Sequence, residues 1–210
     1  MKNLAVFVSG SGTNLENIAV CIENGKLRNC EIALVVCDKP KAFALERARN
    51  HKIKSVVVER ETFTNKTGFE IAILNELNKH SIDFIVLAGY MRILGEAILK
   101  KFENKILNVH PALLPKFPGA HAIRDAFEAK AQETGVTVHF VDSGVDTGPV
   151  ILRQKIKVMP NETLESLEKR IHGVEYALYP KVIQMLVDGK LKVAGGKVLY
   201  DGKPLTAIVQ

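Results

Sequence analysis

Asn108 and His110 lie two residues apart at the end of an apolar run, directly before Pro111. Side chains at positions i and i+2 of an extended chain point to the same face, so an amide and an imidazole would project together from a strand end. Such a pair can stabilise a developing oxyanion and move a proton. Asp146, within the turn-rich residues 142–149, is the third candidate, because a nearby carboxylate would keep His110 protonated at neutral pH. Each residue also has a purely structural interpretation, since Asn and Asp commonly fix turns.

The sequence lacks the residue patterns that covalent and metal-dependent catalysis require. The pattern Gly-x-Ser-x-Gly does not occur, so no serine nucleophile on a strand–helix turn is indicated. No His-x-x-x-His pair occurs, and the three cysteines (Cys21, Cys30 and Cys37) lack the spacing of metal ligands. Cys37 ends an apolar run and is expected to be a small buried hydrophobe. Direct attack of one bound substrate on another remains, with neither a metal nor a covalent enzyme intermediate.

A glycine-rich segment follows the first apolar run. Residues 4–8 read as a buried strand, residues 9–14 contain Gly-Ser-Gly, and residues 15–22 have helical spacing. Backbone N–H groups and the helix dipole would then converge on an anion. The dinucleotide fingerprint is incomplete, because Leu15 stands at its third glycine position, and Gly-Lys-Ser/Thr is absent. The segment suits a single phosphate, and a tight turn without a ligand is the alternative.

The elements that position these residues alternate along the first half of the chain. They are strands at 4–8, 32–37, 55–58, 82–89 and 105–110, and helices at 15–22, 42–50, 67–80 and 96–102. This alternation predicts an α/β fold with an open, mostly parallel, Rossmann-like sheet and helices on both faces. Ligands of such sheets bind beyond the carboxyl ends of the strands. Residues 9–14, Asp38, residues 89–94 and the Asn108–His110 pair are therefore expected to act together.

The second half predicts a different arrangement. A helix at 121–132 precedes alternating residues 135–141, typical of an antiparallel strand, and a further strand at 150–158. A helix that starts near 161 is expected to end before Pro180, with another at 181–188 and a hairpin around 195–203. We also expect a cis peptide bond before Pro115.

The composition is that of an ordinary globular chain. It has 210 residues, 47% hydrophobic and 25% charged, which favours one domain over 1–210, divided into halves 1–103 and 104–210. The net charge of +6 is dispersed, which disfavours nucleic acid and favours small anionic ligands. No apolar run approaches the roughly 20 residues of a membrane span, and no signal peptide is recognisable. We expect a reducing cytoplasm, with no membrane partner.

Two motifs together carry a family resemblance. Residues 108–119, with Asn-Val-His-Pro at the start and Pro-Gly at the end, resemble the active-site stretch of the 10-formyltetrahydrofolate-dependent formyltransferases. Residues 135–149 resemble the longer signature of that superfamily, which ends around its catalytic aspartate. Residues 9–15, 87–94 and 175–180 resemble, in turn, the phosphate loop, the folate-binding strand end and the C-terminal helix of the branch that formylates glycinamide ribonucleotide. The similarity extends over essentially the whole chain.

The resemblance implies a role for each matching residue. The catalytic set would be Asn108, His110 and Asp146; the ribonucleotide set Gly12, Thr13, Asn14 and Glu175; and the folate set Lys66, Met91, Arg92, Ile93, Leu94, Asn108, Asp142 and Val145. The substrate amine would attack the formyl carbon of 10-formyltetrahydrofolate, the co-substrate, and no metal is implied. Two departures stand out: Lys66 replaces a frequent arginine near the folate glutamate, and Ile123 replaces a second histidine present in some members.

Three other functions remain open. A formyltetrahydrofolate hydrolase would use the same catalytic residues with water as acceptor, and would usually carry an extra N-terminal regulatory domain. A methionyl-tRNA formyltransferase would add a C-terminal RNA-binding domain. A folate- or nucleotide-binding module would have no catalysis. The expected partners are the two small-molecule substrates, and the protein is expected to be a monomer or a homodimer.

Overall fold

The structure, a computed structural model, describes residues 1–205 and 208–209. Its contacts group the chain into two compact units, Met1–Leu107 and Asn108–Gln210, which are described separately. The fold is of the predicted α/β class, with a mostly parallel sheet and helices on both faces, and a small antiparallel sheet follows near the C-terminus.

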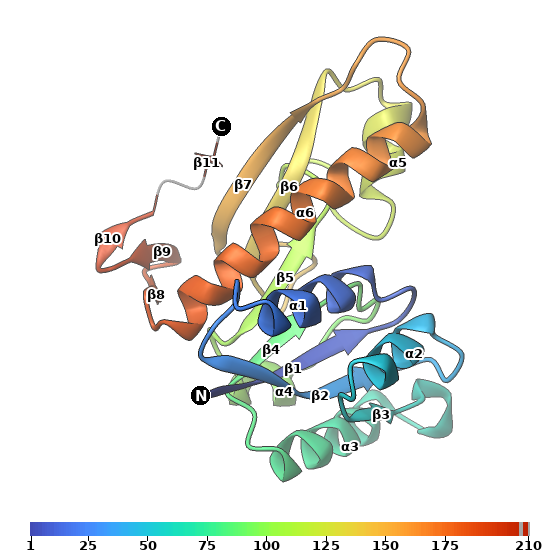
Figure 1. Cartoon of the computed structure of the whole chain (residues 1–210), viewed down its shortest axis with the longest axis vertical. Helices are drawn as coiled ribbons and strands as arrows, with labels where there is room; N and C mark the ends of the chain where they lie inside the picture. The colour runs from blue at the N-terminus through green and yellow to red at the C-terminus, as the bar shows by residue number, and fades with distance from the viewer. Residues whose placement is uncertain (206–207, 210) are drawn as a thin grey trace. The chain divides into compact units, whose positions relative to one another are not determined.

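The first unit alternates strands and helices as predicted. Its strands are β1 (Lys2–Val8), β2 (Cys30–Cys37), β3 (Ser55–Val57) and β4 (Phe84–Leu87), in the order β4-β1-β2-β3 and all parallel. Its helices are α1 (Thr13–Glu23), α2 (Phe43–Asn50), the 3₁₀ helix η1 (Arg60–Thr62), α3 (Lys66–Lys79) and α4 (Glu96–Lys101). In Figure 1, α1 and α2 lie on one face of these strands and α3 on the other. Both faces of β1 are therefore covered, which explains its unbroken apolar run.

The second unit begins within β5 (Ile106–His110), whose last three residues belong to it. Its further strands include β6 (Glu133–Phe140), β7 (Val150–Lys157) and β11 (Ile208–Val209). β6 and β7 are antiparallel, as the alternating sequence predicted, and β11 runs parallel to β7. The helices are α5 (Ala122–Glu128) and the long α6 (Leu164–Val187), which packs against β6 and β7 (Figure 1). The strands β8 (Leu191–Ala194), β9 (Lys197–Tyr200) and β10 (Lys203–Pro204) form a small antiparallel sheet that contains the predicted hairpin.

Two helix predictions in the second unit were wrong. Pro180 does not end a helix but lies inside α6, which continues to Val187. Proline removes one backbone hydrogen bond, at a cost of about 3 kcal/mol. The buried stripe of α6 continues on both sides of it through Leu178, Val182 and Ile183, and that burial outweighs the loss. The helix predicted at 121–132 ends at Glu128.

Two smaller predictions were confirmed. The peptide bond between Leu114 and Pro115 is cis. Cys37 is completely buried, and all three cysteines are free thiols. In the part of the chain that the structure describes, the helices are too short or too polar to span a bilayer.

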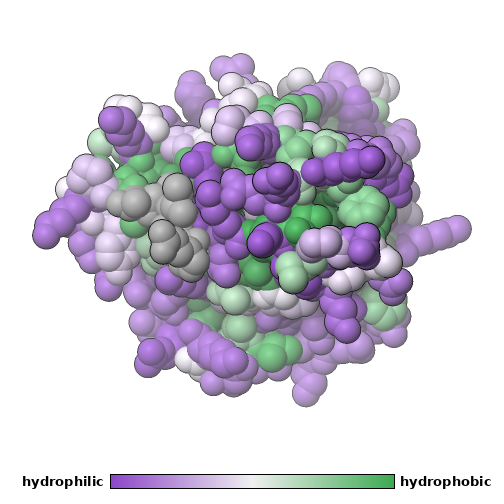
Figure 2. Space-filling model, turned by 90° about the horizontal axis from the view of Figure 1, so that it is seen from above, coloured by the Kyte–Doolittle hydropathy of each residue, from purple (hydrophilic) through white to green (hydrophobic). Residues whose placement is uncertain are grey.

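Figure 2 shows one face of the molecule, where hydrophilic residues surround small, separate hydrophobic patches.

Candidate active site

The structure brings Asn108, His110 and Asp146 together within the second unit. Asn108 and His110 come from the end of β5, and Asp146 comes from the loop between β6 and β7. The Asp146 carboxylate lies 3.4 Å from His110 Nδ1 through one oxygen and 3.4 Å from Asn108 Nδ2 through the other. The three residue types chosen from the sequence therefore form one cluster.

The backbone of Asp146 has a φ angle of +55°, in the left-handed region. Asp and Asn adopt that region more readily than other residues with a side chain, so the turn itself restricts what this position accepts. The carboxylate also accepts a hydrogen bond of 2.9 Å from the Gly119 N–H. Burial opposes ionisation here, but His139, Gly119 and His110 outweigh it and lower the pKa of Asp146. Asp146 is therefore a fixed anion.

His139 is a member of the cluster that sequence reasoning missed. Its Nδ1 lies 2.7 Å from the Phe140 carbonyl oxygen, so this nitrogen carries the ring hydrogen, and Nε2 accepts a hydrogen bond from the Asn108 Nδ2–H at 3.2 Å. The ring is buried, and it also lies 3.7 Å from Asp146. His139 thus fixes which way the Asn108 amide points. The alternation of residues 135–141 was the available signal, since it places His139 on one face with Thr137.

The protonation state of His110 differs from the prediction. Its Nε2 donates to the Phe117 carbonyl oxygen at 2.7 Å, and Nδ1 faces Asp146. Burial lowers the pKa of His110 below its usual value, and the Phe117 bond and the Asp146 charge oppose this without outweighing it. The expectation of a charged histidine at neutral pH was therefore wrong for the resting site, because burial removes more stabilisation from the cation than one carboxylate returns.

The proline-rich segment after β5 is tied to β6. The hydroxyl of Thr137 accepts from the Leu114 N–H at 3.1 Å and donates to the Ala112 carbonyl at 2.6 Å. Phe117, whose carbonyl binds His110, has a φ of +54°. Both bonds of Thr137 are buried, so this segment is a rigid edge of the cluster, as the prolines suggested.

The glycine-rich segment lies in the first unit, between β1 and α1. Gly12 has a φ of +72°, and a Cβ added there would lie 2.6 Å from the Cβ of Ala44. Only glycine therefore meets both requirements without rearrangement. Thr13 and Asn14 begin α1, and the first backbone N–H groups of a helix point out of its N-terminus towards a ligand. Ser9 fixes the segment to the end of β4, since its hydroxyl accepts from the Met91 N–H at 3.0 Å.

The residues expected to contact folate lie in both units. In the first, Arg92 pairs with Asp38 and, at 3.0 Å, with Glu61, which leaves its backbone rather than its side chain for a ligand. The side chains of Met91 and Ile93 are exposed although apolar, and Leu94 is buried. Lys66 begins α3 with an exposed side chain, 3.8 Å from Glu70. The predicted strand ends of this unit do lie together. Residues 9–14 contact the segment after β4 through Ser9, and Asp38 contacts that segment through its ion pair with Arg92.

The remaining predicted ligand residues lie in the second unit. Glu175 is buried in α6, where its carboxylate is 2.9 Å from His172 Nδ1. That bond raises the pKa of His172. Asp142 accepts from the Thr147 hydroxyl at 2.7 Å and so orders its own loop, where Val145 exposes an apolar side chain. Among the described residues, no group of three or more His, Cys, Asp or Glu side chains is placed to hold a metal ion.

Comparison with known proteins identifies the family. Residues 2–183 match the model of the formyl transferase family. The chain is 44% identical over 187 residues to a phosphoribosylglycinamide formyltransferase of Bacillus subtilis, covering 89% of this chain and 95% of that one. A solved glycinamide ribonucleotide transformylase 1 of Geobacillus kaustophilus is 49% identical, with a TM-score of 0.86 over 89% of this chain and 99% of that one. A phosphoribosylglycinamide formyltransferase of Coxiella burnetii, solved in complex with CHES, has a TM-score of 0.94 at 33% identity and covers 100% and 99% of the two chains. The chain belongs to the formyl transferase family.

Proposed function

We propose that this protein transfers the formyl group of 10-formyltetrahydrofolate to the primary amine of glycinamide ribonucleotide, a step of purine biosynthesis. The observation that carries the proposal is the cluster that Asn108 and His110, on a rigid strand end, form with Asp146 from the loop between β6 and β7. The relatives with high identity support the acceptor, because they are named phosphoribosylglycinamide formyltransferases and match over nearly their whole length. We assign the phosphate-binding role to the first unit and the chemical step to the second, within one formyltransferase domain.

The reaction is a direct transfer between two bound substrates. The amine nitrogen attacks the formyl carbon and forms the new C–N bond, and the carbonyl oxygen becomes an oxyanion. The bond to folate N10 then breaks, and the proton lost by the amine ends on N10. No group of the protein forms a covalent bond in this scheme.

Asn108 and His110 stabilise the oxyanion in this proposal. One N–H of the Asn108 amide is committed to His139 at 3.2 Å, whereas its contact with Asp146 is long, at 3.4 Å, so the hydrogen that faces Asp146 is the one we assign to the oxyanion. A developing negative charge beside His110 adds to that of Asp146, and together they favour the imidazolium that burial disfavours. His110 would thus gain its charge by taking up the proton that the amine loses, and would give that proton up again as N10 is protonated.

The ligand contacts follow the predicted sets. Gly12, Thr13 and Asn14 offer helix N–H groups to the phosphate, and Glu175 contacts the glycinamide-ribose part. In the first unit, the exposed apolar side chains of Met91 and Ile93 suit the flat pteridine ring, and we assign polar contacts to the backbone after β4; in the second unit, Val145 exposes a further apolar side chain.

A single assay tests the function. Cleavage of 10-formyltetrahydrofolate is measured with the purified protein, with and without glycinamide ribonucleotide. Cleavage that requires the ribonucleotide supports the proposal. Equal cleavage without it indicates a hydrolase, and no cleavage in either condition indicates a binding module or a tRNA formyltransferase; either result would reject the proposed acceptor.

A further inference from the structure

Helix α2 holds the glycine-rich segment through three contacts. The Arg47 Nε–H donates to the Ser11 carbonyl at 2.9 Å, and the Ala44 N–H donates to the Gly10 carbonyl at 3.1 Å. The third contact is the close packing of Gly12 against Ala44. Of these three, the bond from Arg47 is the one that depends on a polar side chain.

These contacts matter because of what a phosphate needs. An anion is attracted by backbone N–H groups and repelled by backbone carbonyl oxygens. A glycine-rich segment is conformationally free, so nothing local keeps its carbonyls turned away. Donors from α2 fix the carbonyls of Gly10 and Ser11, and the Gly12 carbonyl accepts the Glu16 N–H of α1. Three consecutive carbonyls are thereby engaged away from an anion at the start of α1.

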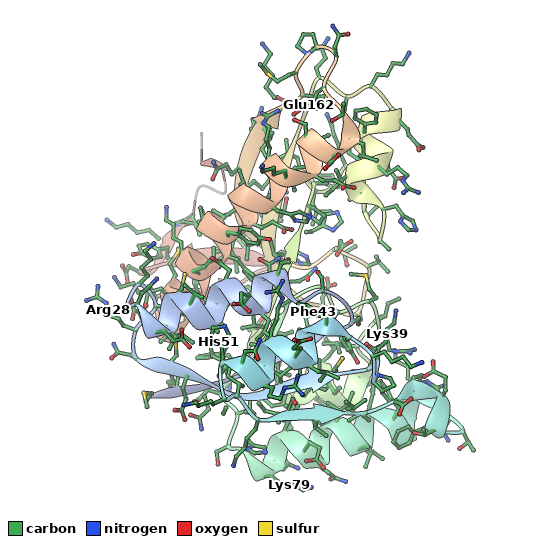
Figure 3. All side chains as sticks on the ribbon, turned by 45° about the vertical axis from the view of Figure 1, so that its right-hand side comes forward. Arg28, Lys39, Phe43, His51, Lys79 and Glu162 are labelled. Carbon is green, nitrogen blue, oxygen red and sulfur yellow. The ribbon has the colours of Figure 1, made fainter. Side chains whose placement is uncertain are left out.

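Arg47 is itself held by a cluster between α1 and α2. Its Nη1 lies 3.1 Å from one oxygen of Glu16, and the other Glu16 oxygen lies 3.0 Å from His51 Nε2. The Nδ1 of His51 lies 2.7 Å from Glu23. Figure 3 shows His51 at the end of α2, beside α1. The guanidinium also lies over the Phe43 ring, 5.0 Å from its centroid. A continuous chain of contacts thus runs from Glu23 to the Ser11 carbonyl.

We propose that Arg47 is a positioning residue for the phosphate-binding segment, and that the Glu16–His51–Glu23 cluster determines how firmly Arg47 holds the Ser11 carbonyl. The inference rests on the proposed function, because it presumes that this segment binds the phosphate of glycinamide ribonucleotide. Arg47 acts through the backbone of Ser11 and not by contact with the reacting atoms.

The cluster gives this positioning a dependence on pH. Both ring nitrogens of His51 lie within hydrogen-bond distance of carboxylates, and only the imidazolium can donate from both. The bond to Glu23 is the main cause that raises the pKa of His51, and Glu16 adds to it. When the proton is lost, Glu16 loses one of its two cationic partners, and the cluster at the start of α1 becomes more negative. We therefore expect phosphate binding to weaken.

The charged surroundings of His51 are mixed. Glu16 and Glu23 face it from α1, Arg47 from α2, and the depression that it lines is also formed by Glu31, Lys52, Lys54 and His80. Histidine is the one residue type in this set whose ordinary charge change falls between pH 5 and 8, and its two members are His51 and His80. His80 therefore serves as the matched control for His51.

The first test is equilibrium binding of glycinamide ribonucleotide by calorimetry to the wild type, Arg47→Ala and Arg49→Ala. Arg49 is exposed on the same helix, so its removal costs the same charge. A lost charge-assisted hydrogen bond predicts about tenfold weaker ribonucleotide binding in Arg47→Ala. Folate binding should be unchanged, and at saturation kcat should stay within about twofold of wild type. A variant that merely folds poorly would instead lose active sites without a change in KM.

The second test compares the ribonucleotide KM of the wild type, His51→Gln and His80→Gln between pH 6 and 9. The ratio of His51→Gln to wild type should exceed one at pH 6 and approach one at pH 9, while His80→Gln follows the wild type throughout. Wild-type-like binding in Arg47→Ala, or a ratio for His51→Gln that does not change with pH, would overturn the inference. A wild type that does not bind the ribonucleotide at all would instead reject the proposed function.

Discussion

His51 in the first unit and His110 in the second both lie beside carboxylates, yet their pKa values move in opposite directions. The partners of His51, Glu16 and Glu23, are hydrated, with 35% and 57% of their side chains exposed. The partner of His110 is Asp146, which is 13% exposed. Bonds to carboxylates raise the pKa of His51, whereas burial lowers that of His110. The charge of a histidine therefore depends both on a neighbouring carboxylate and on how deeply the pair is buried.

The two regions also divide the work in our proposal. The hydrated cluster around His51 favours the charged imidazole and acts on binding, through the backbone of the glycine-rich segment. The buried cluster around His110 gains charge only as an oxyanion forms, and so acts on turnover. Substitutions in the cluster of Asn108, His110 and Asp146 should thus change kcat, and those around α1 and α2 should change ribonucleotide affinity.

The largest effect is expected for Asp146→Asn, which should lower kcat by about 10²- to 10⁴-fold. Asparagine accepts the left-handed backbone and can still accept the Gly119 N–H, so the loop should keep its structure. What is lost is the negative charge that helps His110 become cationic. Steady-state kinetics and folate binding measure the outcome. Near wild-type turnover would remove Asp146 from the mechanism.

A strong but different effect is expected for Gly12→Leu. The positive φ and the contact with Ala44 both oppose a side chain at position 12. Overpacking of about 1–3 kcal/mol corresponds to roughly fivefold to 150-fold weaker ribonucleotide binding. Folate affinity should remain near that of the wild type, as titration of each ligand will show. Equal loss of both affinities would indicate misfolding, and would contradict the proposal that the two regions have separate roles.

The opposite pKa directions predict opposite effects of pH on stability. His110 prefers its neutral form when folded, so its contribution is present above its usual pKa of 6.5 and is lost as the pH falls. His51 prefers its charged form when folded, so its contribution is present below 6.5 and is lost as the pH rises through its raised pKa. Urea unfolding of wild type, His51→Gln and His110→Gln between pH 5 and 9 should show differences in the free energy of unfolding that depend on pH in opposite directions. Parallel pH profiles in the two variants would contradict the comparison.

The smallest effect is expected at the exposed Lys66. Its single charge near a folate carboxylate contributes little, so Lys66→Ala should weaken folate binding about two- to threefold at low salt and hardly at all at high salt. Lys66→Arg is the control that keeps the charge. A loss of roughly tenfold or more, at any salt concentration, would mean that the side chain is buried by the ligand.

The sequence sufficed for the features that are local in the chain. The alternation of elements, the cis bond before Pro115 and the glycine-rich segment are encoded in short stretches. Asn108 and His110 are two residues apart and were found together, and Asp146 entered through a second motif. The antiparallel pairing of β6 and β7 followed from simple alternation.

The features that escaped prediction depend on tertiary environment. His139 binds Asn108 across 31 residues, and the alternation of residues 135–141 indicates the face on which His139 lies but not this partner. The pKa of His110 depends on burial that no spacing reveals, and Pro180 stays helical because α6 is packed on both sides of it. Arg47 and Ser11 are 36 residues apart, so their bond could not be read from either segment.

The contact between Gly12 and Ala44 has a further consequence for protein engineering. Ala44 is fully buried and carries the smallest side chain that still fills the space beneath the glycine. Any larger residue at position 44 would push the segment outward, and glycine would leave it less supported. Substitutions of increasing size at position 44 should therefore lower ribonucleotide affinity progressively. They would do so without changing any residue that we assign to the ligand.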